Sequence, residues 1–215
     1  MNFEAKQPYQ HSTYYMKNLI RDTMWTQKQL LETIDHVTIE NMEHFVGKFF
    51  CQGIFIESLY YGNILRRDAI ALQERLVAKL KSSRHVLPLQ PSMNVNYRHI
   101  QLRDGSNHLY TVENKVHETK SLELFLQTGL QSSRANALAE LYNEMVKEKF
   151  FDTLRTKEQL GYIVHSWVRS LAGVNGLSFI IQSDKSPDYL DDRIETFLKS
   201  VNVKLSPPKK KNSFQ

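Results

Sequence analysis

The most informative segment of this chain is Leu154-Arg155-Thr156-Lys157-Glu158-Gln159-Leu160-Gly161-Tyr162-Ile163-Val164. It predicts the end of a helix that turns into a strand, because two leucines stand among polar residues and the last three residues are strongly β-prone. Gly161 has no side chain, so it allows another segment to approach the turn closely.

Arg155 and Tyr162 flank this turn and are the candidate substrate-binding residues. Arg155 offers a planar fork of N–H donors and Tyr162 offers a phenolic hydroxyl, so together they could hydrogen-bond a peptide carbonyl or the oxyanion formed from it. In a structural alternative, Arg155 caps the helix end and Tyr162 covers an edge of the core. The residue types alone favour neither interpretation.

The residues around the turn predict antiparallel strands and helices. An inward-facing set, Leu138, Leu141, Tyr142 and Met145, predicts a helix over residues 136–151. The other elements expected here are a hairpin of strands 97–102 and 108–113, a strand at 122–128, a strand from the turn to about 168, a turn at 173–176, a strand at 177–182 and a helix over 188–199. This order predicts an α+β fold, a two-layer sandwich with an antiparallel-rich sheet and helices on one face.

The first part of the chain is predicted to be mostly helical. Helices are expected within residues 12–35, with Thr26 as an N-cap and Gln29 as its capping-box partner. A further helix is expected from about Thr38 to Gly53, followed by a buried strand at 54–61 and an amphipathic helix over 64–80. Prolines at 88 and 91 predict a linker.

Composition restricts the class of protein. The 215 residues, 41% of them hydrophobic, suffice for a core, and no apolar run is long enough to span a membrane. The first ten residues resemble neither a secretory signal nor a transit peptide. Cys51 is the only cysteine, which excludes an internal disulfide and favours a reducing compartment, so we expect the cytoplasm, with the mitochondrion as an alternative. The net charge of +5 lies partly in Lys209-Lys210-Lys211, and without an RNA-binding or zinc-finger motif it indicates a solvated basic surface rather than a nucleic-acid site.

The histidines do not form a helical zinc motif. No two of the eight stand three or four residues apart, and near-matches at Glu43-His44 and His117-Glu118 lack the second histidine. We therefore expect no metal ligand and no catalytic residue on this chain. Ligands drawn from distant parts of the sequence stay open.

Residues 154–164 resemble the signature of the insulysin group of pitrilysin-type zinc peptidases, the inverzincins. The resemblance runs from about Asn2 to Leu198 and includes Gln7-Pro8, Tyr14-Tyr15, residues 114–117 and residues 179–183. It implies a zinc metalloendopeptidase that encloses peptides in a chamber. The positions that match the group's substrate-binding residues are Arg155 and Tyr162, whereas the zinc and the general base of this group lie on the N-terminal half.

The resemblance also implies how the chain is divided. Residues 1–88 would be the end of the third peptidase domain, 89–96 a linker, 97–200 the first part of the fourth domain and 201–215 a divergent basic tail. A portion without the zinc site is expected to be inactive alone. Its expected partners are peptide substrates, the N-terminal catalytic half and further copies of itself, but neither membranes nor nucleic acid. The alternative is a non-catalytic short form that binds peptides or the full-length peptidase.

Overall fold

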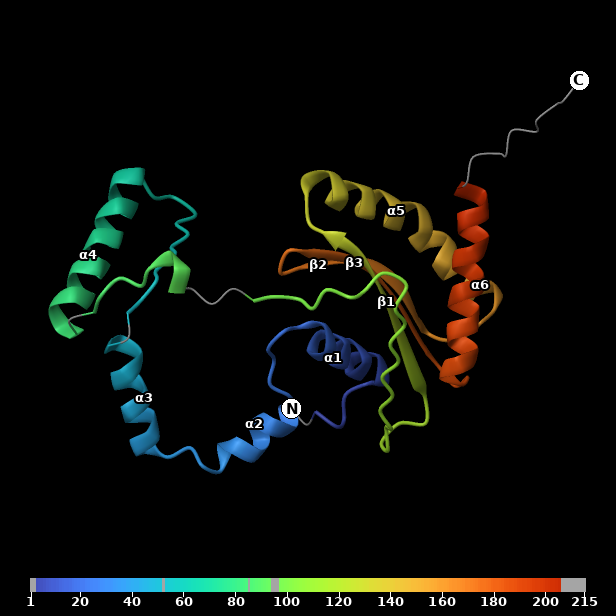
Figure 1. Cartoon of the computed structure of the whole chain (residues 1–215), viewed down its shortest axis with the longest axis horizontal. Helices are drawn as coiled ribbons and strands as arrows, with labels where there is room; N and C mark the ends of the chain where they lie inside the picture. The colour runs from blue at the N-terminus through green and yellow to red at the C-terminus, as the bar shows by residue number, and fades with distance from the viewer. Residues whose placement is uncertain (1–2, 52, 85, 94–96, 206–215) are drawn as a thin grey trace, which may run out of the picture. The chain divides into compact units, whose positions relative to one another are not determined.

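The computed structural model describes residues 3–51, 53–84, 86–93 and 97–205, which form two compact units (Figure 1). Unit 1 combines Met1–Trp25 with Tyr97–Gln215, and unit 2 is Thr26–Asn96. The described helices include none that is both long and apolar enough to cross a membrane.

The described part of unit 1 contains helices, a π-helical turn and strands. In chain order they are α1 (Pro8–Ile20), β1 (Lys120–Leu130), α5 (Ser133–Phe151), the π-helical turn η2 (Asp152–Lys157), β2 (Ile163–Leu171), β3 (Val174–Ser183) and α6 (Pro187–Leu205). The side chain of Ser132 caps α5 by accepting a hydrogen bond from the backbone N–H of Ala135 at 3.0 Å.

The three strands pair antiparallel in the order β1-β3-β2, so β3 lies in the middle of the sheet. Leu124 of β1 stands opposite Phe179, and Val164 of β2 stands opposite Ile181. A register shift after Gln127 marks a β-bulge in β1. The predicted α+β class with an antiparallel sheet is confirmed.

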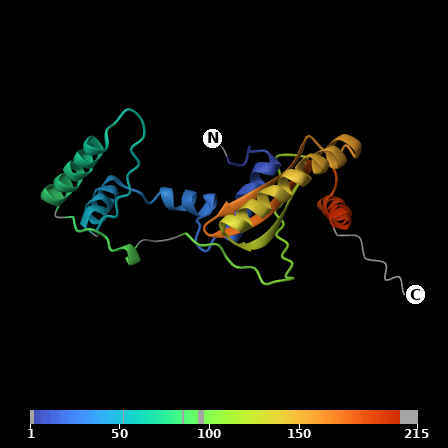
Figure 2. The same cartoon turned by 90° about the horizontal axis from the view of Figure 1, so that it is seen from above.

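The core of unit 1 lies between one face of the sheet and helices α5 and α6 (Figure 1, Figure 2). Phe150 of α5 is fully buried, and its ring centroid lies 5.2 Å from that of Phe179 and 5.3 Å from that of Phe197. The buried apolar side chains of this core are those of Val146, Phe150, Leu154, Leu160, Val164, Leu177, Phe179, Ile181, Leu190, Ile194, Phe197 and Val201.

The opposite face of the sheet contacts α1. Because side chains alternate along a strand, Ile180 and Gln182 of β3 point away from the α5–α6 core. The backbone N–H of Tyr9 in α1 donates a 3.0 Å hydrogen bond to Oε1 of Gln182. A buried ion pair between Arg169 and Glu123 lies on this same face. The helix thus fixes the N-terminal residues to the central strand.

Unit 2 contains α2 (Gln27–Ile34), α3 (Ile39–Cys51), α4 (Arg66–Arg84) and a 3-10 turn, η1 (Pro91–Met93). The predicted cap of α2 is confirmed, because the Thr26 hydroxyl accepts from the Gln29 N–H while the Gln29 side chain accepts from the Thr26 N–H at 2.8 Å. None of the residues of α2 and α3 that the structure describes is buried.

Two predicted strand regions are wrong. Residues 54–61 form no strand, because within the described chain only Ile54 has a strand-like backbone partner, Pro88, while Leu59 and Tyr61 lie exposed. Residues 97–113 form no hairpin, although the predicted turn is present as a hydrogen bond from Ser106 N–H to the Arg103 carbonyl. The backbone of 98–100 pairs instead with the end of α1, where Asp22 N–H donates to Arg98 at 3.0 Å and Ile100 N–H to Ile20 at 2.9 Å.

The predicted inner face of α5 is also largely wrong. Leu138 and Leu141 are 56% and 57% exposed and Met145 is exposed as well, whereas only Tyr142 of the predicted set packs partly on the core. The helix buries a neighbouring stripe, Ala139, Asn143, Val146 and Phe150. The sequence of α5 carries apolar residues on two neighbouring stripes, and the predicted stripe is not the one that packs on the core.

The hairpin between β2 and β3 turns earlier than predicted. Ala172 and Gly173 both have positive φ, at 51° and 83°, as two-residue type I′ turns require. Gly176 lies inside β3, where a Cβ atom would overlap the ring of Phe125. Glycine therefore marks a close side-chain approach there, not a turn.

The two compact units do not follow the predicted division at residues 89–96, because α1 packs with the sheet that follows residue 97. Residues 94–96 of the predicted linker and 206–215 of the predicted tail lie outside the described residues. The assignment of residues 1–88 to the third domain and of residues 97–200 to the fourth domain of a longer peptidase stays a prediction.

Candidate functional site

The helix that leads to the candidate site changes its winding before it ends. α5 continues into η2, where the N–H of Glu158 donates to the carbonyl of Thr153 at 3.0 Å, a separation of five residues. The next apolar residue, Leu160, donates from its N–H to Leu154 at 3.0 Å, and both leucine side chains are buried. Short π-helical turns are rare and frequently lie at functional sites.

Arg155 is held against its neighbour in the predicted pair. Its Nη1 donates a 2.8 Å hydrogen bond to the backbone carbonyl of Tyr162, and its guanidinium carbon lies 4.4 Å from the centre of the Tyr162 ring. The ring of Phe151 lies on it as well, at 4.9 Å. Contacts at these distances are favourable cation–π interactions. The structure thus brings the two predicted residues together.

Tyr162 projects into solvent. The residue is 77% exposed. It therefore does not cover an edge of the core, as the structural alternative required. Arg155 donates a hydrogen bond to the Tyr162 carbonyl, beyond the end of its own helix. Gly161, just before it, lies so near the carbonyl oxygen of Gln182 that any Cβ atom would overlap it, which confirms the predicted close approach.

A shallow recess opens beside Tyr162. The surface exposed in it is mostly carbon, although many of the residues that line it carry amide or hydroxyl groups. They come from three parts of unit 1: Gln7, Tyr9, Thr119, Gln159, Leu160, Gly161, Tyr162, Ile163, Gln182, Ser183 and Asp184. Gln182 joins these parts, because its Nε2 lies 3.3 Å from the Thr119 hydroxyl and 3.4 Å from Oε1 of Gln7. Side-chain amides and hydroxyls can donate to and accept from peptide groups.

Asp184 is the charged residue of the recess lining. A hydrogen bond from Lys185 and the charge of that lysine hold the pKa of the Asp184 carboxyl below its usual range, so it is ionised at neutral pH. Sequence reasoning did not single out Gln7, Gln182 or Asp184 as site residues. The signal was present in part, because Gln7-Pro8 and residues 179–183 were among the stretches that carried the resemblance.

The described residues do not fit a zinc ion. Within residues 3–51, 53–84, 86–93 and 97–205, no three side chains of the His, Cys, Asp and Glu types lie close enough together to hold a metal. The near-motif residues His44 and His117 stand in different units, in α3 and shortly before β1.

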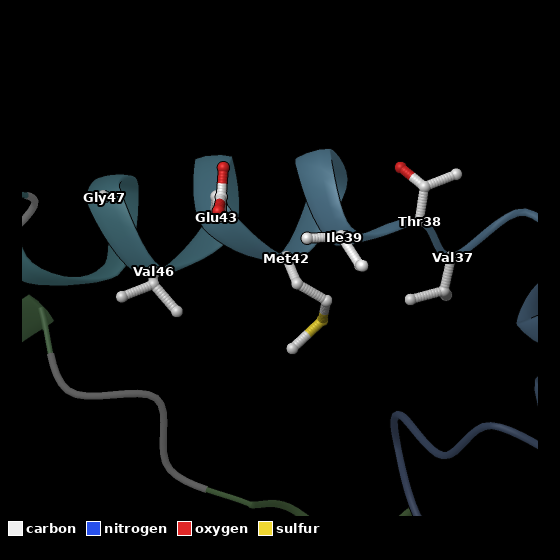
Figure 3. Close-up of a pocket in the computed structure, with 7 residues that line it drawn as sticks. All are labelled: Val37, Thr38, Ile39, Met42, Glu43, Val46 and Gly47. Carbon is white, nitrogen blue, oxygen red and sulfur yellow. The ribbon is translucent and has the colours of Figure 1, made fainter.

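A second, apolar hollow lies on unit 2. It lies along the first part of α3 and is lined by Val37, Thr38, Ile39, Met42, Glu43, Val46 and Gly47. Figure 3 shows Val37, Met42 and Val46 pointing to one side of this segment, while Thr38 and Glu43 point to the other. The hollow carries apolar carbon atoms and no cluster of reactive groups, so it indicates a packing surface and not a catalytic site.

Comparison with known proteins gives relatives over nearly the whole chain. The insulin-degrading enzyme of Homo sapiens is 41% identical over 92% of this chain and 19% of its own length, and that of Drosophila melanogaster is 37% identical over 93% and 20%. A Caenorhabditis elegans protein named as a zinc protease is 33% identical over 95% of this chain and 24% of its own length. The chain therefore spans about a fifth of the length of the curated relatives it matches.

Family models and solved structures agree with these relatives. Residues 141–214 match the model described as PQQ synthase PqqF-like, C-terminal lobe domain 4. Pitrilysin has the same fold, with a TM-score of 0.70 over 95% of this chain and 21% of the pitrilysin chain at 19% identity. The predicted resemblance is thus confirmed: this chain is similar to the insulin-degrading enzymes over nearly its whole length and has the fold of pitrilysin.

Proposed function

We propose that the chain is the substrate-holding portion of a pitrilysin-type zinc endopeptidase and that Tyr162 and Arg155 contact the bound peptide. One observation carries the proposal: the Tyr162 side chain is 77% exposed, yet its backbone carbonyl and its ring are both held by Arg155. An exposed aromatic residue with a fixed base is suited to binding, because little side-chain freedom is lost when the ligand arrives.

The two residues would divide the work. The Tyr162 hydroxyl donates to a carbonyl oxygen of the peptide or to the oxyanion that develops from it. Arg155 has five N–H donors, and its hydrogen bond within the described residues uses Nη1. Its remaining donors and its charge lie beside the ring, where they favour the same oxygen as negative charge builds up.

The recess beside Tyr162 supports the binding of an extended peptide. Amide and hydroxyl groups from Gln7, Thr119 and Gln182 line it, and these groups match the donors and acceptors of a peptide backbone. The names of the relatives make insulin a suitable probe.

The chemistry of cleavage would come from elsewhere in the protein. In the proposal, the zinc ion and the general base belong to an N-terminal catalytic half, which polarises the scissile carbonyl while this chain orients it. We further propose that residues 1–88 belong to the third domain of the peptidase and residues 97–200 to its fourth domain. Copies of the protein would associate with one another. The protein would work in the cytoplasm or the mitochondrion. The match of residues 141–214 to a fourth-domain model supports the second of these domain ranges.

The test is binding of fluorescein-labelled insulin B chain to the 215-residue protein, followed by fluorescence anisotropy. Tyr162→Phe removes only the hydroxyl, so we expect the dissociation constant to rise roughly three- to tenfold, the scale of one net hydrogen bond. Tyr97→Phe makes the same change at another exposed tyrosine of unit 1 and should leave the affinity unchanged. Equal binding by all three proteins would contradict the proposal.

A second candidate function is a non-catalytic protein that binds the full-length peptidase. It is favoured by the apolar side chains of unit 2 that lie on the surface, among them Leu31, Ile39, Phe45 and Phe49. Contiguous exposed apolar surface marks sites of contact with other proteins. Co-purification of the tagged chain with a full-length relative would support this function, and loss of co-purification in Ile39→Ser but not in Lys28→Ser would place the contact on α3.

A further inference from the structure

An ion pair behind the candidate site joins the turn to α6. Nε of Arg193 donates to Oε2 of Glu158 at 2.7 Å, and Nη2 donates to Oε1 at 2.6 Å. Both side chains are mostly shielded from solvent, with 28% and 23% exposed. Two parallel hydrogen bonds between a planar guanidinium and a carboxylate fix distance and angle together, which a single contact does not.

The pair fixes one end of the segment that carries Tyr162. Glu158 follows η2 directly, and the next residue, Gln159, has a left-handed φ of 53°. Glutamine adopts this conformation only at some cost, so the flanking contacts must hold it in place. Leu160, buried in the core, and Gly161, pressed against β3, fix the other end.

The two charged residues do not line the recess themselves. Within the turn, the residues that line it begin at Gln159, one position after Glu158, and Arg193 is not among the lining residues. Any effect of the pair on a peptide would therefore pass through the backbone of the turn. Arg155 completes the arrangement from the opposite side, because its guanidinium holds the Tyr162 carbonyl.

We infer that Glu158 and Arg193 are positioning residues for Tyr162: their ion pair sets the path of residues 159–161 and thereby the direction in which the Tyr162 hydroxyl meets the peptide. The inference rests on the proposed function of Tyr162. It predicts that the pair changes peptide affinity and not only the stability of the fold.

The experiment uses the 215-residue protein and fluorescein-labelled insulin B chain. Arg193→Met removes the charge and the fork and should raise the dissociation constant roughly fivefold, as for a partly shielded, doubly hydrogen-bonded pair. Arg193→Lys keeps the charge but loses the fork and should fall between Arg193→Met and the wild type. Glu195→Gln is the matched control, because it breaks the exposed Glu195–Lys199 pair on the same helix and should leave the affinity unchanged.

A double-mutant cycle with Tyr162→Phe separates positioning from stability. In the Tyr162→Phe background, Arg193→Lys should cause no further loss of affinity, since the hydroxyl that it positions is absent. Chymotryptic cleavage after Tyr162 gives a reading that needs no ligand, and Arg193→Lys should accelerate it several-fold.

Each result decides a different question. Equal binding by the wild type and Tyr162→Phe overturns the proposed function and this inference with it. Weaker binding by Tyr162→Phe with unchanged binding by both folded Arg193 variants overturns only the positioning role. An equal loss with Arg193→Lys in both backgrounds also overturns it, because the pair would then act without Tyr162.

Discussion

The guanidinium of Arg155 touches Tyr162 twice, by a 2.8 Å hydrogen bond to its backbone carbonyl and by a 4.4 Å approach to its ring. The two contacts act on one residue from one side. Arg155 is therefore a support for Tyr162 even before any peptide arrives, and the sequence motif encodes a pair and not two separate binding groups.

Replacing Arg155 by lysine should loosen this pair while keeping the charge. An ammonium group has no planar fork, so it cannot both donate to the Tyr162 carbonyl and stack on the ring. We expect chymotrypsin to cleave after Tyr162 several-fold faster in Arg155→Lys than in the wild type, as followed by mass spectrometry. Arg134→Lys, the same change at an exposed arginine of α5, should leave the rate unaltered.

Gly161→Ala should destabilise unit 1. The added methyl group would overlap the carbonyl oxygen of Gln182, which belongs to a paired strand and cannot move aside. We expect the free energy of unfolding in urea to fall by about 1–3 kcal/mol, the usual cost of overpacking.

The matched change at Gly47 should have the opposite sign. Gly47 lies within α3, and no atom stands near the position of its missing Cβ. Alanine there should stabilise the helix by about 0.5–1 kcal/mol. A similar result for Gly47→Ala and Gly161→Ala would mean that the close approach at β3 does not exist in solution.

Phe150→Ala should remove the centre of the core. Its ring is fully buried between Phe179 and Phe197, so its loss should lower the free energy of unfolding by about 3–5 kcal/mol. Phe45→Ala, at an exposed position of α3, should stay within about 0.5 kcal/mol of the wild type. Thermal denaturation followed by circular dichroism measures both, and comparable losses would show that α3 is buried in solution.

His99 should make unit 1 less stable in mild acid. Burial, with the nearby charges of Arg21 and Arg169, lowers the pKa of His99 from 6.5 in the folded state. The unfolded chain therefore binds the proton more readily, and stability is lost as the pH falls from 6.5 toward the lower folded-state pKa. In His99→Gln the melting temperature should vary less between pH 7.5 and pH 5.5 than in the wild type, and an equal variation would exclude this role.

The sequence predicted the elements whose partners are local. The cap of Thr26 by Gln29 depends on residues three positions apart, and it has the expected form. The type of fold followed from the order of these elements. Arg155 and Tyr162 were also found together, because the turn that joins them is short.

The failures have a common physical cause, which is dependence on distant partners. Residues 54–61 have the composition of a strand but lie beside no other strand within the described chain. The recess was missed because Gln7, Thr119 and Gln182 are far apart in the sequence and meet only through the packing of α1 on β3. No periodicity within one segment reports such a meeting.

The backbone pairing of Asp22 with Arg98 means that the chain leaves unit 1 and returns to it at the same place. Unit 2 is thus an insertion into the sequence of unit 1. The chain must close a loop of 71 residues, 26–96, before α1 and the sheet of unit 1 can meet. A linker of about nine residues in place of unit 2 would have roughly one eighth of that length. It would lower the entropic cost of closing the loop by roughly 2 kcal/mol. Every residue that lines the recess beside Tyr162 belongs to unit 1, so the chain passes through all of unit 2 between Gln7 and Tyr9 on one side and the other residues of that lining on the other.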